Sequence, residues 1–470
     1  MRNWLVLSGI VAATGCGSSG NDLTCGSGTT LVGDTCEAGS GSGSGDVCGA
    51  GTHVDTDGVT CVPDGPAASA APTITSMDPT NTGIGGGSLF TITGTGFAGD
   101  DISTLTVFFG DTTDSNCQAT VGAASATMVS GEVPQACALS VNVTVTVTTN
   151  LGSATTPFQY DILFAADGDA NGNSGGTGDL YVIDPFLGES FDLGPLVDAN
   201  DTAYGIGGIA FDATGTLWGV TTGDSAADVD GTSQLVMITP DLADGVGGVT
   251  VIGDAVDTDG GLYFIEDIKF SGGVLYGWAY YDTDGEGDFN QTLVSISTTD
   301  GTVTQLSAGV GDSYGLAGMA VDGGGNLFVA ANGAGAEDDT IFTSGELDSV
   351  STADGTVTAA ATLDLADGNG NGLGIPVQAM SFLGTSMVAV LDSGTYAEFV
   401  GNTFSGEFLA LIDPAGSPIV SPLFELPGQF LNQAPHVDAI DFAPATLVIS
   451  RKLPRSGWRH LDAARVPAKH

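Results

Sequence analysis

The 470-residue sequence predicts an all-β protein in which a β-sandwich and a β-propeller follow an N-terminal stalk. Three observations support this fold class. Short runs rich in Val, Ile, Leu, Phe and Thr alternate with many of the 74 glycines, which is typical of strands joined by turns. Hydrophobic residues make up 42% of the chain, enough to bury a core. Apolar segments also recur at regular intervals after residue 160.

The charge of the chain limits its partners. Lys and Arg total 8 against 56 Asp and Glu, a net charge of −48, and up to residue 450 the only basic residues are Arg2 and Lys269. Repulsion on this scale favours solubility and opposes compaction unless cations offset it. We therefore expect no nucleic-acid partner, and we expect bound Ca²⁺, a salty medium, or both.

Residues 1–15 are predicted to be a signal peptide. Arg2 precedes an apolar stretch at 4–13 that is too short for a membrane span. The stretch ends in "ATGC", which resembles the lipobox of bacterial lipoproteins, although Ala replaces the usual Leu. The resemblance implies that Cys16 is lipidated, which would leave six of the seven cysteines to pair in an oxidising compartment. Ordinary cleavage nearby, which would leave a free Cys16, is the alternative.

Residues 16–70 are predicted to form a disordered, Gly/Ser-rich stalk that carries two similar units, "CGSGTTLVGDTC" and "CGAGTHVDTDGVTC". Units this short cannot build a core, so we expect disulfides to fix their shape. Local pairing of Cys25 with Cys36 and of Cys48 with Cys61 is the simplest connectivity. Zinc binding by these four cysteines is the alternative, which the absence of CxxC spacing disfavours.

The residue pattern of 71–160 predicts a β-sandwich. The run "VNVTVTVTT" alternates Val with polar residues, as in a half-buried strand. The module resembles the IPT/TIG domain, an immunoglobulin-like β-sandwich, which implies a spacer or protein-contact role without catalysis. A polar insertion at 110–125 departs from the family pattern, and Cys117 could pair with Cys137 to staple it. The residues that carry the resemblance are Pro72, Ile74, Pro79, Gly86, Gly87, the 92–97 run, Val133, Pro134, Phe158 and Tyr160.

Residues 161–446 are predicted to form a propeller of repeated four-stranded blades. Asp-Gly hairpins such as "SISTTDGTVTQL" join the outer strands. The first repeat starts at a second strand, "ILFAAD", and "VDAIDFA" near the C-terminus matches an innermost strand, so the two ends should complete one blade of five. A sixth blade stays open because "ATLVIS" could form a further second strand. Equivalent apolar positions, spaced by 51 to 61 residues, are Phe211, Phe270, Val321, Phe382 and Phe442.

The loops after each second strand, and those between blades, should share one strongly acidic face. Carboxylates at alternate positions can converge on a hard cation such as Ca²⁺. Neither of the two best loops has the bidentate Glu that ends an EF-hand loop, and plain Asp/Asn/Gly loop formation is the alternative. The predicted calcium ligands are Asp167, Asp169, Asn171, Asp282, Asp284, Glu286 and Asp288. A loop between blades adds Asp254, Asp257 and Asp259 to the same acidic face.

We predict a non-catalytic binding or adhesion protein of the bacterial surface. It would be secreted across the inner membrane, lipid-anchored at the outer membrane or cell surface, monomeric, and directed at a protein or glycan ligand. G-x-S-x-G matches at Ser174 and Ser313 lack the strand–helix setting of a nucleophile elbow. The alternative is a metal-dependent hydrolase or lyase that uses innermost-strand carboxylates, namely Glu266, Asp267, Asp438 and Asp441. The basic segment 447–470 is expected to be disordered.

Overall fold

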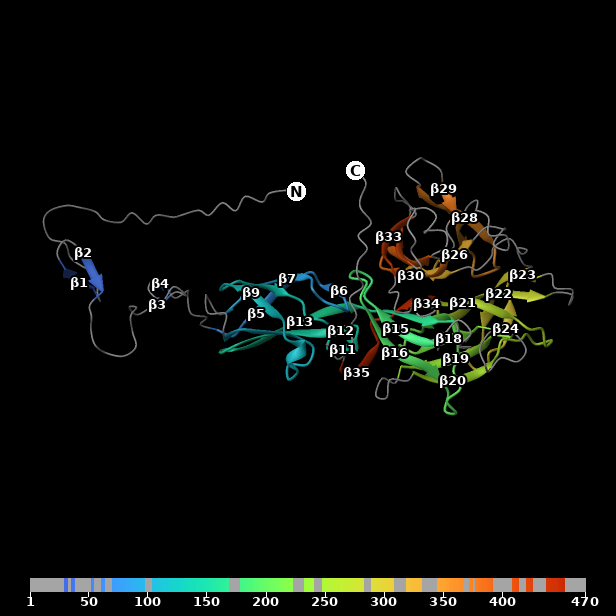
Figure 1. Cartoon of the computed structure of the whole chain (residues 1–470), viewed down its shortest axis with the longest axis horizontal. Coiled ribbons are helices and arrows are strands. Elements are labelled where there is room, and N and C mark those ends of the chain that lie inside the picture. The colour runs from blue at the N-terminus through green and yellow to red at the C-terminus, as the bar shows by residue number, and fades with distance from the viewer. Residues whose placement is uncertain are drawn as a thin grey trace. The chain divides into compact units, whose positions relative to one another are not determined.

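The computed structural model divides into two compact units, residues 1–67 and 68–470 (Figure 1). It describes residues 29–32, 35–38, 52–54, 61–63, 70–97, 104–168, 178–222, 232–240, 247–282, 289–307, 318–331, 345–366, 372–374, 377–391, 408–413, 420–425 and 437–452. In this part of the chain no helix is long and apolar enough to cross a bilayer.

The first unit contains two short hairpins where the sequence predicted a disordered stalk. β1 (Thr29–Val32) pairs with β2 (Thr35–Ala38), and β3 (Thr52–Val54) pairs with β4 (Cys61–Pro63). Thr and Val, which favour strands, flank the Gly- and Asp-containing turn of each cysteine unit. Cys16, Cys25 and Cys48 lie outside the described residues, so lipidation and the two stalk disulfides remain predictions.

Residues 73–161 fold into the predicted sandwich of two four-stranded sheets. Val145 and Val147 of the alternating strand are buried, as its period predicted. Phe90, Phe109 and Phe158 pack ring against ring in the core. One sheet has the order β5 (Thr73–Asp78), β7 (Leu89–Thr95), β10 (Met128–Glu132), β9 (Thr120–Ala124); the other has β6 (Asn81–Gly83), β13 (Gly152–Asp161), β12 (Asn142–Thr149), β8 (Thr106–Phe109).

A disulfide staples the polar insertion of the sandwich, as the sequence predicted. Cys117, in a short 3₁₀ turn (Ser115–Cys117), bonds to Cys137 with a Cα–Cα distance of 5.3 Å. The bridge spans 20 residues of sequence, and closing a loop of this size stabilises a fold by about 3 kcal/mol. It therefore anchors a segment that has few apolar residues of its own.

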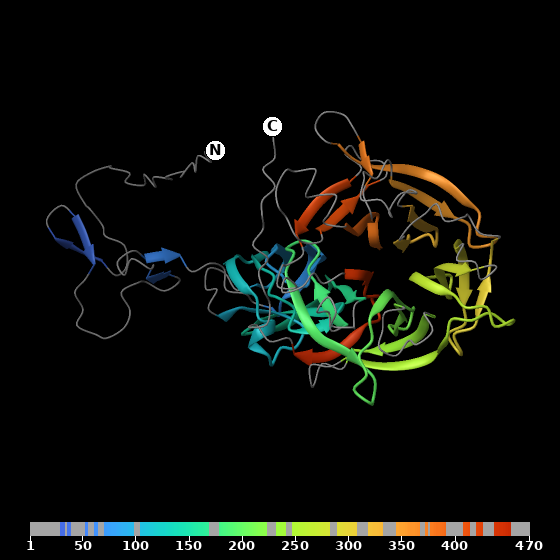
Figure 2. The same ribbon diagram turned by 45° about the vertical axis from the view of Figure 1, so that its right-hand side comes forward.

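The remaining strands form five blades around an axis, which confirms the propeller (Figure 2). Each blade has four strands, given from the innermost outward: β34 (Val437–Phe442), β14 (Leu163–Asp167), β15 (Asp179–Ile183), β16 (Ser190–Val197); β17 (Ile206–Phe211), β18 (Leu217–Thr221), β19 (Gln234–Thr239), β20 (Gly247–Asp254); β21 (Phe264–Ser271), β22 (Val274–Asp282), β23 (Phe289–Ile296), β24 (Val303–Gln305); β25 (Met319–Val321), β26 (Leu327–Ala331), β27 (Gly345–Val350), β28 (Val357–Ala366); β30 (Val377–Leu383), β31 (Ser386–Leu391), β32 (Phe408–Ile412), β33 (Val420–Glu425). β29 (Gly372–Gly374) extends the fourth blade.

The two ends of the propeller meet in one blade, as predicted from the incomplete first and last repeats. β34, from near the C-terminus, pairs antiparallel with β14, with Ala165 opposite Ile440. The repeat positions also hold, because each predicted apolar residue lies at the same end of an innermost strand. Phe211 faces Leu217, and Phe382 faces Met387.

The segment "ATLVIS" does not start a sixth blade. β35 (Val448–Lys452) pairs instead with β11 (Ala138–Ser140) of the sandwich, with Leu139 opposite Ile449. Leu447 is buried in the same hydrophobic core as the sandwich residues. Apolar residues at 447–449 explain why this stretch is a strand, so the expectation of a disordered tail from residue 447 is wrong for 448–452.

Candidate functional site

Four of the innermost strands each place one residue at the lining of a single cavity. In three of them a register shift skips a single residue, which leaves Gly207, Glu266 and Gln378 outside the ladder. In the closing blade the shift skips Asp438. Such bulges re-aim a side chain away from its sheet. Four blades therefore contribute equivalent residues to one place.

These residues line a small cavity together with Thr222, Phe264 and Ile265. Its volume is about 70 Å³, room for about two water molecules. Asp438 Oδ2 accepts a hydrogen bond from Gly168 N at 2.8 Å, and the Gln378 side-chain oxygen is buried without a partner. The lining is rich in acceptors, so a small cation or water suits it better than an organic molecule.

Gly168 and Thr222 show on which face this cavity opens. Gly168 follows the second strand of the closing blade, and the Thr222 hydroxyl donates to its carbonyl. Thr222 in turn follows the second strand of the next blade, and its amide donates to Gly205, in the loop between these blades. In these two blades, the residues that follow the second strands therefore lie beside the loop between the blades.

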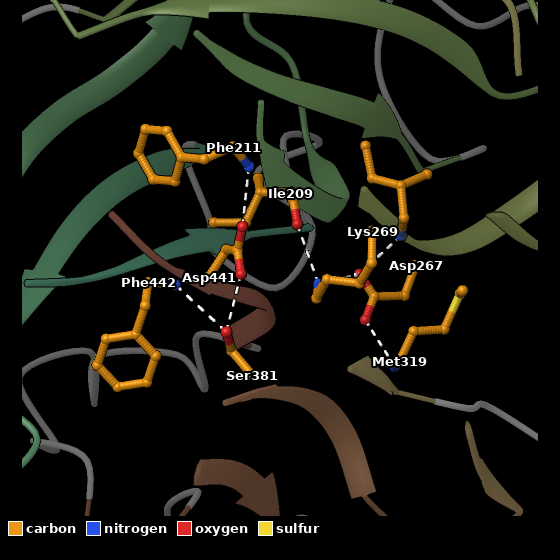
Figure 3. A network of polar contacts seen from close by, with 9 residues as sticks. Ile209, Phe211, Asp267, Lys269, Met319, Ser381, Asp441 and Phe442 are labelled. Carbon is orange, nitrogen blue, oxygen red and sulfur yellow. Dashed lines mark hydrogen bonds and ion pairs between the residues drawn. The ribbon is translucent and has the colours of Figure 1, made fainter. Parts of the chain in front are cut away.

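A second level of the axis holds a buried polar network (Figure 3). Lys269 Nζ lies 2.9 Å from Asp267 Oδ1 and donates to Ile209 O at 3.0 Å. Asp267 Oδ2 accepts from Met319 N at 2.8 Å. The ion pair thus ties the innermost strands of three adjacent blades. Burial raises the pKa of the Asp267 carboxyl to about 6, although the Lys269 charge opposes this.

Asp441 completes this network on the other side of the axis. Its Oδ2 accepts from Phe211 N and its Oδ1 from the Ser381 hydroxyl, both at 2.8 Å, while Ser381 Oγ accepts from Phe442 N (Figure 3). Burial raises the pKa of Asp441, and the Lys269 charge opposes the rise. In the part of the chain that the structure describes, the innermost strands of neighbouring blades form no backbone ladder with one another, and these side-chain contacts link them instead.

The four predicted axial carboxylates therefore split into two pairs. Glu266 and Asp438 line the cavity, whereas Asp267 and Asp441 are bonded in the network beneath it. Gln378 and Thr222 were not predicted. Gln378 occupies the same repeat position as Glu266 and Asp438, so an alignment of the repeats to single-residue accuracy would have found it.

The predicted calcium loops fall largely outside the described residues. Asp169, Asn171, Asp284, Glu286 and Asp288 lie there. Asp282 ends β22 opposite Phe289. Asp167 is buried at the end of β14, opposite Val437, rather than in an open loop. Among the described residues, no three His, Cys, Asp or Glu side chains form a group that could hold a metal ion.

Several acidic residues build turns instead. Asp257, predicted to belong to the acidic face, accepts amide hydrogen bonds from Asp259 and Gly261. Asp198 repeats this pattern in the preceding loop between blades, with Asn200 and Thr202 as donors. Asp254, also predicted, accepts from the Gln234 side chain. Asp201, Asp254 and Asp259 remain exposed on this face.

Comparison with known proteins identifies the sandwich alone. Residues 72–160 match the IPT/TIG domain, so this part of the chain is an IPT/TIG domain, as its sequence markers predicted. No curated protein matches the sequence.

Solved structures resemble the chain only distantly. A Bacteroides thetaiotaomicron VPI-5482 protein of unknown function is 13% identical, over 69% of this chain and 96% of its own, with a TM-score of 0.23. A thermostable family-43 glycoside hydrolase is 12% identical over 46% and 71%, with a TM-score of 0.31. A periplasmic gluconolactonase from Pseudomonas aeruginosa is 12% identical over 56% and 81%, also at 0.31. Likenesses this weak carry no argument about function.

Proposed function

We propose that the chain is a non-catalytic surface-binding protein that recognises a protein or glycan with the loop face of its propeller. In this reading a lipid at Cys16 anchors it to the bacterial surface, and the IPT/TIG domain spaces the propeller from the anchor. The observation that carries the proposal is the size of the cavity that the described residues form at the axis. Its volume of about 70 Å³ is far below the 300–1,000 Å³ of small-molecule sites. We therefore assign recognition to the outer face.

Calcium is the cofactor we propose for the loops of this face. The net charge of −48 favours cation binding in general. The loops between the second and third strands carry carboxylates at alternating positions, a pattern that favours calcium binding. We expect added Ca²⁺ to raise the melting temperature and to slow proteolysis of the folded protein. If chelation leaves the melting temperature unchanged, calcium does not stabilise these loops.

The binding role is tested by a glycan and protein array with matched charge variants. One variant replaces the exposed aspartates of the loop face, Asp201, Asp254 and Asp259, with Asn. The control replaces three exposed acids of the sandwich, Asp78 and Asp111 with Asn and Glu132 with Gln. Both variants remove three charges. We expect the first alone to weaken binding at least tenfold, and equal loss in both would refute a role for this face.

The acceptor-rich cavity favours a second candidate, a metal-dependent hydrolase or lyase. Glu266 and Asp438 would then hold a cation at the axis. The test is substrate turnover with Ca²⁺, Mn²⁺ or Zn²⁺. Turnover that is lost in Glu266→Gln and in Asp438→Asn, but kept in the exposed-turn variant Asp300→Asn, would establish the enzyme in place of the binding role.

A further inference from the structure

Three carboxyl groups are buried where the sandwich meets the propeller. Asp161 ends β13 of the sandwich, while Asp184 and Glu189 flank the turn between β15 and β16 of the propeller. Their exposed fractions are 4%, 0% and 7%. Carboxylates are seldom buried to this degree unless they are paired or protonated.

Asp184 directly joins the two domains. Its Oδ1 accepts from Phe186 N and Leu187 N, both at 2.8 Å, and so fixes its own turn. Its Oδ2 accepts from Gly85 N at 2.6 Å. Gly85 belongs to the sandwich and lies 99 residues earlier in the chain. A single side chain therefore holds a sandwich loop against a propeller turn.

The sandwich loop "GIGGG" at 83–87 is built to admit these carboxylates. A Cβ on Gly83 would overlap the Asp184 carboxylate. A Cβ on Gly85 would lie 2.9 Å from Asp184 Oδ2 and 3.0 Å from Glu189 Oε2, closer than side-chain carbons tolerate. Asp184 and Glu189 thus converge on Gly85, a position that has no room for a larger side chain.

Few charged and titratable groups surround Asp161 and Asp184 among the residues that the structure describes. On the sandwich side Asn81 donates to Asp161 Oδ2 at 2.7 Å, and Tyr160 donates to Pro134 O. Asp192 of β16 is exposed. Of the basic residues, Lys269 is bonded to Asp267 and Ile209 O, and Lys452 of β35 lies opposite Ala138, with Arg451 before it.

No described positive charge therefore opposes the burial of Asp161 and Asp184. Burial raises the pKa of Asp184 against its backbone hydrogen bonds. It also raises the pKa of Asp161 against the Asn81 hydrogen bond, and the Asp184 charge adds to the rise. The described acids also do not group as metal ligands. A proton is the species that relieves such a cluster.

We propose that the sandwich–propeller junction is a proton-controlled clamp. Protonation of the pair formed by Asp161 of the sandwich and Asp184 of the propeller tightens the contact between the two domains, and ionisation of both carboxyls loosens it. A carboxyl that is harder to ionise in the folded state contributes stability that is complete below its unfolded pKa of about 4. This contribution is lost as the pH rises through the folded value.

The test is calorimetry of the full chain between pH 4 and pH 8, comparing wild type with Asp161→Asn. The amide oxygen of the variant can still accept from Asn81, but the charge is gone. We expect equal melting temperatures at pH 4 and an advantage of about 1–3 °C for the variant at pH 7. We also expect the wild-type endotherm to split into sandwich and propeller components as the pH rises, and the variant endotherm to stay single.

Asp198→Asn is the control, because this aspartate lies in an exposed turn outside the cluster and its pKa is lowered rather than raised. It should not gain on wild type with rising pH. A difference between wild type and Asp161→Asn that is constant with pH, or one that grows without splitting the wild-type endotherm, would overturn the clamp.

Discussion

At the scale of single residues, many of the acids serve as turn builders. Asp198, Asp212, Asp257 and Asp322 each accept amide hydrogen bonds from the residues two and four positions later. Such Asx turns orient loop backbones without any ligand. The acidic composition therefore reflects turn geometry as well as the loop face.

One of these turns carries a strained residue. Asp201 has a φ of 63°, in the left-handed region. The equivalent position in the three related turns is Gly215, Gly260 or Gly325, all with positive φ and the same backbone hydrogen bond. Left-handed backbone is costly for residues with a Cβ, and glycine avoids that cost but loses more entropy on folding. We expect Asp201→Gly to raise the free energy of unfolding by about 0.5 kcal/mol in urea denaturation, and Asp201→Ala to lower it. If Asp201→Gly instead lowers the free energy of unfolding, the aspartate side chain stabilises the turn by more than its left-handed backbone costs.

The turn aspartates also predict how the protein responds to acid. The Asn326 side chain, with the Asn326 and Gly324 amides, lowers the pKa of Asp322 although burial acts to raise it. Because the folded pKa lies below the unfolded value of about 3.9, this stabilisation is present above pH 4 and is lost as the pH falls through the folded pKa.

Asp322→Ala should therefore lose stability at pH 6 but approach wild type near pH 2. Equilibrium denaturation at the two pH values measures this. Asp259→Ala, at an exposed position, is the control and should follow wild type throughout. A deficit of Asp322→Ala that persists undiminished at pH 2 would contradict the role of the ionised carboxylate.

At the scale of elements, the C-terminal strands fasten both domains. β34 closes the first blade, and β35 follows within a few residues to pair with β11 of the sandwich. The linker between them is held as well, since Asn142 of the sandwich donates to Ala445 O at 2.7 Å and the Thr446 hydroxyl donates to Ala213 O at 3.1 Å. Propeller closure and sandwich completion thus depend on one segment.

Leu447 tests this fastening. It is 6% exposed and belongs to the core that runs through both domains. Leu447→Ala should lower the free energy of unfolding by about 2–4 kcal/mol. Leu262→Ala, at a leucine 53% exposed, is the matched control and should have little effect. Truncation after residue 452 should leave folding intact, whereas truncation after residue 446 should destabilise both domains. Similar melting temperatures for both truncations would contradict the role of β35.

Elements with strong periodic patterns could be predicted from sequence, and isolated contacts could not. The alternation in 141–149 and the repeat around Phe211 and Phe382 fixed strands and blade count, because burial imposes a period on every strand. The partner of β35 was missed because strand pairing depends on residues about 300 positions away. The buried network of Asp267 and Asp441 was not predicted, because composition does not reveal which carboxylate forms an ion pair with the buried Lys269.

At the scale of the whole molecule, the net charge of −48 should govern stability. Asp and Glu outnumber basic groups so far that repulsion acts across the whole surface, and such repulsion between exposed charges is screened within about 8 Å at physiological ionic strength. Salt should therefore stabilise the protein whether or not any specific cation site exists. A simple increase of melting temperature with calcium would not separate the two effects.

Comparison at equal ionic strength separates them. We expect NaCl from 10 to 500 mM to raise the melting temperature gradually, because screening acts on all charges together. If calcium occupies loop sites, 1 mM CaCl₂ in 150 mM NaCl should raise it further by several degrees, since a ligand that binds only the folded state stabilises it through mass action. MgCl₂ at 1 mM is the matched control, because it supplies the same charge to sites that suit the larger ion. If the two salts raise the melting temperature equally, calcium acts only by screening charge. The loop carboxylates would then remain available to a ligand.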